Sequence, residues 1–126
     1  MNHIIYAGLP EHVKDLYLGG GQILNFKKEM VSVLLQNACN LVGCEYEQLL
    51  NGRRLAEIVK AKRLFFHFMR THTSDSLEKI ASYIGCDHAT VIHHVKTCKG
   101  YLDIKDAEYT LLVKQYKKLN QNLLIY

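Results

Sequence analysis

The segment from Ser76 to Cys98 constrains the fold of this chain more than any other, because its pattern indicates two short helices joined by a tight turn. The apolar residues of the first half recur at the spacing of one helix face and are Leu77, Ile80, Ala81 and Ile84. Gly85 ends that helix, and a second apolar set follows, Val91, Ile92, Val95 and Cys98. Ser76 and Asp87 precede the two helices as candidate N-caps. Two short helices with one shared core predict a helix-turn-helix.

The second helix keeps a polar face when its apolar stripe is turned inward. The residues left for a partner are Ala89, Thr90, His93, Lys96 and Thr97. They offer a methyl group, hydroxyls, an imidazole and an ammonium, without a carboxylate that would repel phosphate. The second helix of a helix-turn-helix conventionally enters the DNA major groove. The pattern alone also fits a plain helical hairpin buried in an all-α domain.

The segment GCDHATVIHHVK, which begins at Gly85, resembles the signature of the C-terminal DNA-binding domain of the bacterial replication initiator DnaA. The order of elements is similar to that domain from Val31 to Leu119, about 70% of the 126 residues. The resemblance implies a compact, all-α, multi-helix domain of the DnaA domain IV or Trp-repressor type. No GxxxxGK[ST] motif occurs in the sequence, so we expect no ATPase activity, no enzymatic function and no cofactor.

The resemblance also implies roles for individual residues. His88, Ala89, Thr90 and His93 would lie in the major groove, and Arg54 would reach into the minor groove, whose negative potential suits an arginine. Together with the charge pattern it assigns phosphate contacts to Arg53, Lys60, Lys62, Arg63, Arg70 and Lys96. The alternative for these cations is a solvated loop and helix face. Because Ala89 cannot hydrogen-bond a base edge, and because the turn before Asp87 is one residue short, we expect weaker reading of the initiator's own sequence.

The remaining chain predicts one helical domain with an extension. Residues 1–28 form an N-terminal extension whose triple glycine at Gly19 favours a flexible joint over a phosphate-binding loop, and residues 29–126 form the helix-turn-helix domain. Helical spacing predicts a core helix from Phe26 to Val42, a short turn or helix from Cys44 to Leu50, and a long helix from Leu55 to Thr71. The apolar residues predicted to face inward from the short segment are Tyr46, Leu49 and Leu50. A last amphipathic helix within residues 105–126 would close the core through Ala107, Leu111, Leu112, Gln115, Tyr116 and Leu119.

Composition adds few constraints. A net charge of +4 is compatible with nucleic acid, and six cations lie between Arg53 and Arg70, opposed there only by Glu57. The Cys and His residues of the second helix cannot converge on one ion, so we expect no metal site and no nucleophilic catalysis. The four cysteines, Cys39, Cys44, Cys86 and Cys98, are interpreted as apolar residues of a reducing compartment. No signal peptide or membrane span is recognised, which predicts a location in the bacterial cytosol or nucleoid and no membrane partner.

These observations favour sequence-preferring binding to double-stranded DNA, in a regulator of replication or transcription carried by a phage or other mobile element. The alternative is a protein-interaction module that kept the fold. It would bind a partner, or a second copy, through the apolar ends at residues 1–18 and 119–126.

Overall fold

The structure, a computed structural model, describes residues 23–51 and 55–125. The predicted glycine joint near Gly19 and the two loop arginines, Arg53 and Arg54, lie outside these residues. The described helices are α2 (Ile23–Val42), α3 (Tyr46–Leu50), α4 (Ala56–His72), α5 (Leu77–Ser82), α6 (His88–Asp103), α7 (Ala107–Leu119) and the 3-10 helix η2 (Gln121–Ile125). No strand occurs in residues 23–51 and 55–125, so the all-α prediction is confirmed.

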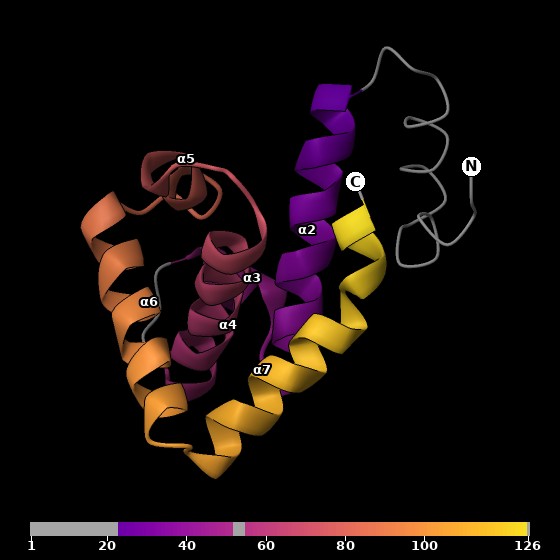
Figure 1. Cartoon of the computed structure of the whole chain (residues 1–126). Coiled ribbons are helices and arrows are strands. Elements are labelled where there is room, and N and C mark those ends of the chain that lie inside the picture. Colours follow the sequence, from indigo (N-terminus) through magenta and orange to yellow (C-terminus); the bar gives the residue numbers. More distant parts are fainter. Residues whose placement is uncertain (1–22, 52–54, 126) are drawn as a thin grey trace.

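Helix α4 is the centre of the domain. It contacts α2, α3, α5, α6 and α7, and Figure 1 shows it between α6 on one side and α2 on the other. Because neighbours cover several of its faces, α4 buries more than the single stripe that the sequence predicted. The consecutive residues Leu64, Phe65 and Phe66 are all buried, as is Met69. The core therefore surrounds α4, and the other helices are held against it.

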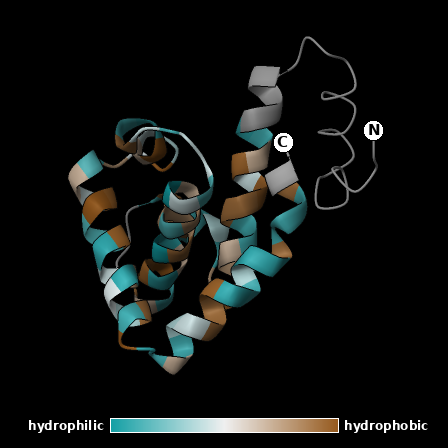
Figure 2. Cartoon of the chain, in the orientation of Figure 1, coloured by the Kyte–Doolittle hydropathy of each residue, from teal (hydrophilic) through white to brown (hydrophobic). Residues whose placement is uncertain are grey.

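The last helix is turned only partly as predicted, because Leu112 and Tyr116 face the core as expected but other predicted residues do not. Tyr109 and Tyr116 are buried, whereas Leu111 and Leu119 are 54% and 48% exposed. Ala107 and Gln115, also predicted to face inward, are exposed as well. The buried tyrosines decide the orientation, since the Tyr116 hydroxyl donates a 2.7 Å hydrogen bond to the Leu34 carbonyl oxygen. Figure 2 shows hydrophilic and hydrophobic residues interspersed along the α7 ribbon.

The short helix α3 also departs from the prediction. Leu49 is fully buried, but Leu50 is 45% exposed, so the expectation that both face inward was wrong. Successive residues of a helix point about 100° apart, and a helix of five residues with one core-facing side cannot bury both.

The turn between α5 and α6 depends on a left-handed residue. Gly85 has φ +84°, and the amides of Gly85 and Cys86 both donate to the Ala81 carbonyl oxygen. The N-caps on either side are in place, because Ser76 Oγ accepts from the Lys79 amide and Asp87 Oδ1 accepts from the Thr90 amide. The chain thus stops one helix and starts the next within a few residues.

Two glycine replacements in this region are expected to change stability in opposite directions. A Cβ at Gly85 meets no atom within 4 Å, so Gly85→Ala should lower the free energy of unfolding by about 1 kcal/mol through backbone strain alone. Gly100 lies inside α6, also with open space, and Gly100→Ala should raise that free energy by about 0.5–1 kcal/mol. Urea denaturation followed by circular dichroism measures both values. Equal effects of the two variants would contradict the assigned turn.

No helix in the described ranges is both long enough and apolar enough to span a membrane.

Candidate nucleic-acid interface

The outer face of α6 carries the residues that the sequence predicted for a partner. His88, Ala89 and His93 are exposed, and Thr90 is half-buried beside them. The opposite face packs inward through Val91 and Cys98, both fully buried. The four predicted major-groove residues therefore share one accessible surface, which is called the α6 face below and which also includes the exposed Lys96.

Hydrogen bonds within α6 restrict what its hydroxyl groups can offer. The Thr90 hydroxyl donates to Asp87 Oδ1 at 2.8 Å, and the Thr97 hydroxyl donates to the His93 carbonyl oxygen. Hydrogen bonds from the Thr90 amide and hydroxyl lower the pKa of Asp87, so this carboxyl is ionised at the positive end of the helix dipole. The Thr90 hydroxyl oxygen can therefore still accept a hydrogen bond from a partner, and the methyl group can still contact one. The hydroxyl proton is already donated to Asp87.

Lys62 of α4 lies beside the turn of the helix-turn-helix. Burial raises the pKa of the Cys86 thiol, and the nearby Lys62 ammonium opposes that rise. Lys62 also contributes to lowering the pKa of His94 in α6. Lys62 stands on α4, which packs against both α5 and α6. Its half-exposed side chain is therefore close to the two helices that would meet DNA.

The sequence patterns gave no role to His94. Its ring stacks on Phe66 with centroids 5.7 Å apart and planes 26° from parallel, and its buried Nδ1 has no hydrogen-bond partner. Burial lowers the pKa of His94 to about 4, and nearby Arg63, His93 and Lys62 act in the same direction. His94 is thus a neutral packing residue that joins α6 to α4. Helical spacing could have predicted that His94 faces inward, because it lies three residues after Val91 and four before Cys98.

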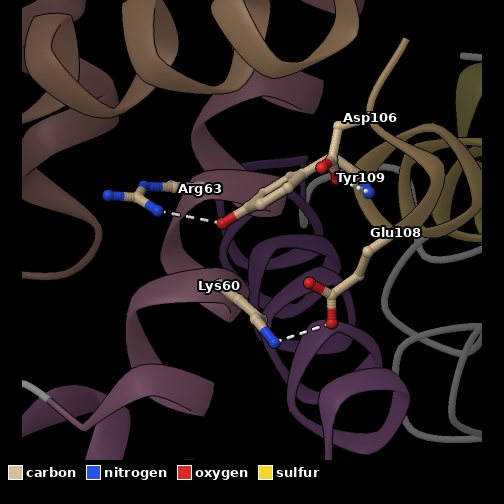
Figure 3. Close-up of polar contacts among 5 residues, drawn as sticks. All are labelled: Lys60, Arg63, Asp106, Glu108 and Tyr109. Atoms are coloured by element: carbon tan, nitrogen blue, oxygen red, sulfur yellow. Dashed lines mark hydrogen bonds and ion pairs between the residues drawn. The ribbon is translucent and has the colours of Figure 1, made fainter.

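Two of the predicted phosphate ligands are engaged by α7 (Figure 3). Lys60 Nζ lies 2.7 Å from Glu108 Oε2, and Arg63 Nη1 donates to the Tyr109 hydroxyl at 2.9 Å. The Tyr109 ring in turn stacks on Tyr101 of α6 at 4.3 Å. The cationic face predicted along α4 is therefore divided, because Lys60 and Arg63 connect α4 to α7. Arg70, further along the helix, is exposed.

The basic loop and the cysteines complete the predicted set. Arg53 and Arg54 are outside the described residues, so their assignment to phosphate and to the minor groove stays a prediction. All four cysteines are free thiols, two of them, Cys39 and Cys98, buried. No group of three or more His, Cys, Asp or Glu side chains suited to a metal ion occurs within the described part of the chain.

Comparison of the sequence with known proteins finds a matching family and several relatives. The family model described as "Bacterial dnaA protein helix-turn-helix" matches residues 31–98. The chain is 31% identical over 116 residues, 91% of its length, to the chromosomal replication initiator protein DnaA of a Picosynechococcus species. It is 30% and 32% identical to the proteins of that name from Bacteroides thetaiotaomicron and Bacteroides fragilis, over 74% and 62% of its length. The matched part spans 26%, 20% and 17% of those three proteins.

Proposed function

Because this chain belongs to the bacterial DnaA helix-turn-helix family, we propose that it binds double-stranded DNA with a sequence preference. The observation that carries the proposal is the α6 face, where exposed imidazoles and Lys96 stand on a helix with no acidic residue between Asp87 and Asp103. A helix of this kind fits the major groove, and the single carboxylate at its start is already used as a cap. The alternative, a module that binds only proteins, has no need of such a face.

The proposed contacts follow from exposure and from existing hydrogen bonds. His88, Ala89, Thr90 and His93 would meet base edges, with the Ala89 and Thr90 methyl groups suited to thymine. Lys62 and Lys96 are proposed phosphate ligands on the two helices α4 and α6, and Arg53 and Arg70 are proposed for the same role. Lys60 and Arg63 would first have to leave Glu108 and Tyr109. Arg54 is the proposed minor-groove residue.

The proposed setting is a site of the type that replication initiators occupy. The relatives carry the name chromosomal replication initiator protein, and a chain that recognises similar boxes would regulate replication or transcription by occupying them. Since Ala89 offers no hydrogen bond to a base, we propose a moderate preference for such boxes.

Fluorescence anisotropy with two labelled duplexes tests the proposal. One duplex carries an initiator-type AT-rich box and the other a scrambled sequence, each titrated at low and moderate salt. We expect about tenfold tighter binding to the box and a steep loss of affinity with salt for both duplexes. Lys62→Ala should weaken both duplexes alike and reduce the salt slope by about one.

The matched control removes a lysine that lies on another helix. Lys118 is exposed on α7, and Lys118→Ala should bind both duplexes as the unmodified chain does. Salt-sensitive binding without preference would leave a general duplex binder. Absence of binding to either duplex at low salt would overturn the proposal and favour a protein partner.

A further inference from the structure

The turn from α6 into α7 places a lysine in a conformation that favours glycine. Lys105 has φ +57°, the one positive value among the non-glycine residues that the structure describes. Its amide donates to the Leu102 carbonyl oxygen, and the Asp106 amide donates to that of Tyr101. This is the Schellman arrangement, in which the left-handed residue is usually glycine. A strained non-glycine residue that persists points to a use for its side chain.

The Lys105 side chain lines a shallow groove between the end of α6 and the start of α7. The groove has a volume of about 490 Å³ and is lined by Leu102, Lys105, Ala107, Thr110, Leu111 and Lys114. Leu111 is 54% exposed there, and the adjacent Ile104 is 74% exposed. The groove is thus an apolar floor with an ammonium group supplied by each of two lysines.

The charged side chains that line this groove, Lys105 and Lys114, are both positive. Asp106 accepts a hydrogen bond from the Tyr109 amide as the cap of α7, and Glu108 is paired with Lys60. Asp103, in the last turn of α6, is exposed, but it does not line the groove. Lys105 and Lys114 form no ion pair with a described residue. A ligand that covers this floor gains most if it brings carboxylates to the lysines.

The groove is also separate from the proposed DNA contacts. Leu102 follows His88 by fourteen residues along α6, which corresponds to about 21 Å of helix. In Figure 1 the α6–α7 turn lies at the end of the domain opposite α5. An occupant of the groove would leave the amino-terminal half of α6 uncovered.

We propose that this groove binds an acidic amphipathic helix of a protein partner. Apolar side chains of that helix would rest on Leu102 and Leu111, and its carboxylates would face Lys105 and Lys114. A second copy fits poorly, because it would bring the same lysines together. Nucleic acid makes no use of the apolar floor, and a lipid surface favours protruding apolar residues over a hollow. The inference is independent of DNA binding and goes beyond it.

Selection from a displayed library of random 16-residue peptides against the full chain tests the proposal without assuming a partner. Peptides enriched in Asp and Glu, with apolar residues at helical spacing, are expected. Their dissociation constants for the chain and its variants are then measured by isothermal titration calorimetry. Leu111→Glu, which places a carboxylate on the floor of the groove, should weaken the peptides by about tenfold or more.

Lys105→Gly separates a role in binding from a role in folding. The variant relieves the left-handed strain, so its melting temperature should rise, while peptide affinity falls by about threefold or more. Lys28→Ala removes an exposed lysine from α2 and should leave affinity unchanged. A rise in melting temperature with unchanged affinity would overturn the role of Lys105.

The groove proposal is overturned if no peptide is enriched, if the enriched peptides are neutral or basic, or if they bind Leu111→Glu as tightly as the unmodified chain. Anionic vesicles that bind the unmodified chain but not Leu111→Glu, with no acidic peptide selected, would identify a lipid ligand instead. Duplex binding by the Leu111→Glu and Lys105→Gly variants should be unchanged. The peptide measurements therefore test the groove proposal, and the duplex measurements test the DNA proposal separately.

Discussion

Replacing His93 by glutamate should weaken duplex binding by about a hundredfold or more, equivalent to about 2.7 kcal/mol, while the fold stays intact. His93 is exposed near the middle of the α6 face, between the Ala89 methyl group and Lys96. In the proposed complex a carboxylate there would be desolvated against base edges and phosphates, without a cationic partner from the DNA. Stability should not suffer, because the introduced carboxylate and the Lys96 ammonium would stand at a favourable i, i+3 spacing on an exposed helix.

A charge-matched control distinguishes this local effect from a change in net charge. Gln115 is exposed on α7, and Gln115→Glu also adds one carboxylate to the chain. It should bind duplex about as well as the unmodified protein in the same anisotropy titration. Equal losses in the two variants would mean that overall charge, and not the α6 face, governs binding. Unchanged duplex binding by His93→Glu would contradict the proposal that α6 enters the major groove.

Replacing Phe66 by alanine should lower the free energy of unfolding by about 3–5 kcal/mol. The Phe66 side chain is fully buried, and its ring lies 5.7 Å from those of Phe65 and His94. Its loss leaves a cavity between α4 and α6, the contact that holds α6 against the core. Since a small domain is stable by only about 5–15 kcal/mol, the variant should be partly or largely unfolded at physiological temperature. Urea denaturation monitored by circular dichroism measures the change.

Phe66→Leu is the variant that keeps the experiment informative if the alanine variant does not fold. A leucine fills most of the space, so the loss should be about 1.5 kcal/mol or less. It also removes the aromatic face on which His94 stacks. Because burial, and not that face, is the main cause that lowers the pKa of His94 to about 4, and because leucine keeps most of the burial, we expect the pKa of His94 to stay well below its ordinary value of 6.5 in Phe66→Leu. Nuclear magnetic resonance titration of the imidazole measures this, and a His94 pKa near 6.5 in Phe66→Leu would contradict the burial described.

Local sequence determined the helices of this domain with few errors. The i, i+3, i+4 spacing, the caps at Ser76 and Asp87 and the glycine stop at Gly85 are short-range features, and each acts through hydrogen bonds within a few residues. For the same reason helical spacing identified Ala89, Thr90, His93 and Lys96 of the α6 face, whereas His88 was assigned from the family resemblance. Their contacts with DNA remain a prediction.

Only the tertiary structure decided which way ambiguous helix faces turn. In α7 the sequence predicted that Leu111 and Leu119 face inward beside Tyr116, but both leucines are exposed and Tyr109 is buried instead. The outcome depends on a partner far away in sequence, the Leu34 carbonyl oxygen, which accepts the Tyr116 hydroxyl. Likewise, Lys60 and Arg63 carry the same charge as Lys62, but Glu108 and Tyr109 of α7 engage the first two. A helical wheel gives the angle of a side chain about its own axis. It contains no information on which neighbour stands at that angle, and that neighbour decides whether a leucine is buried or a cation is free.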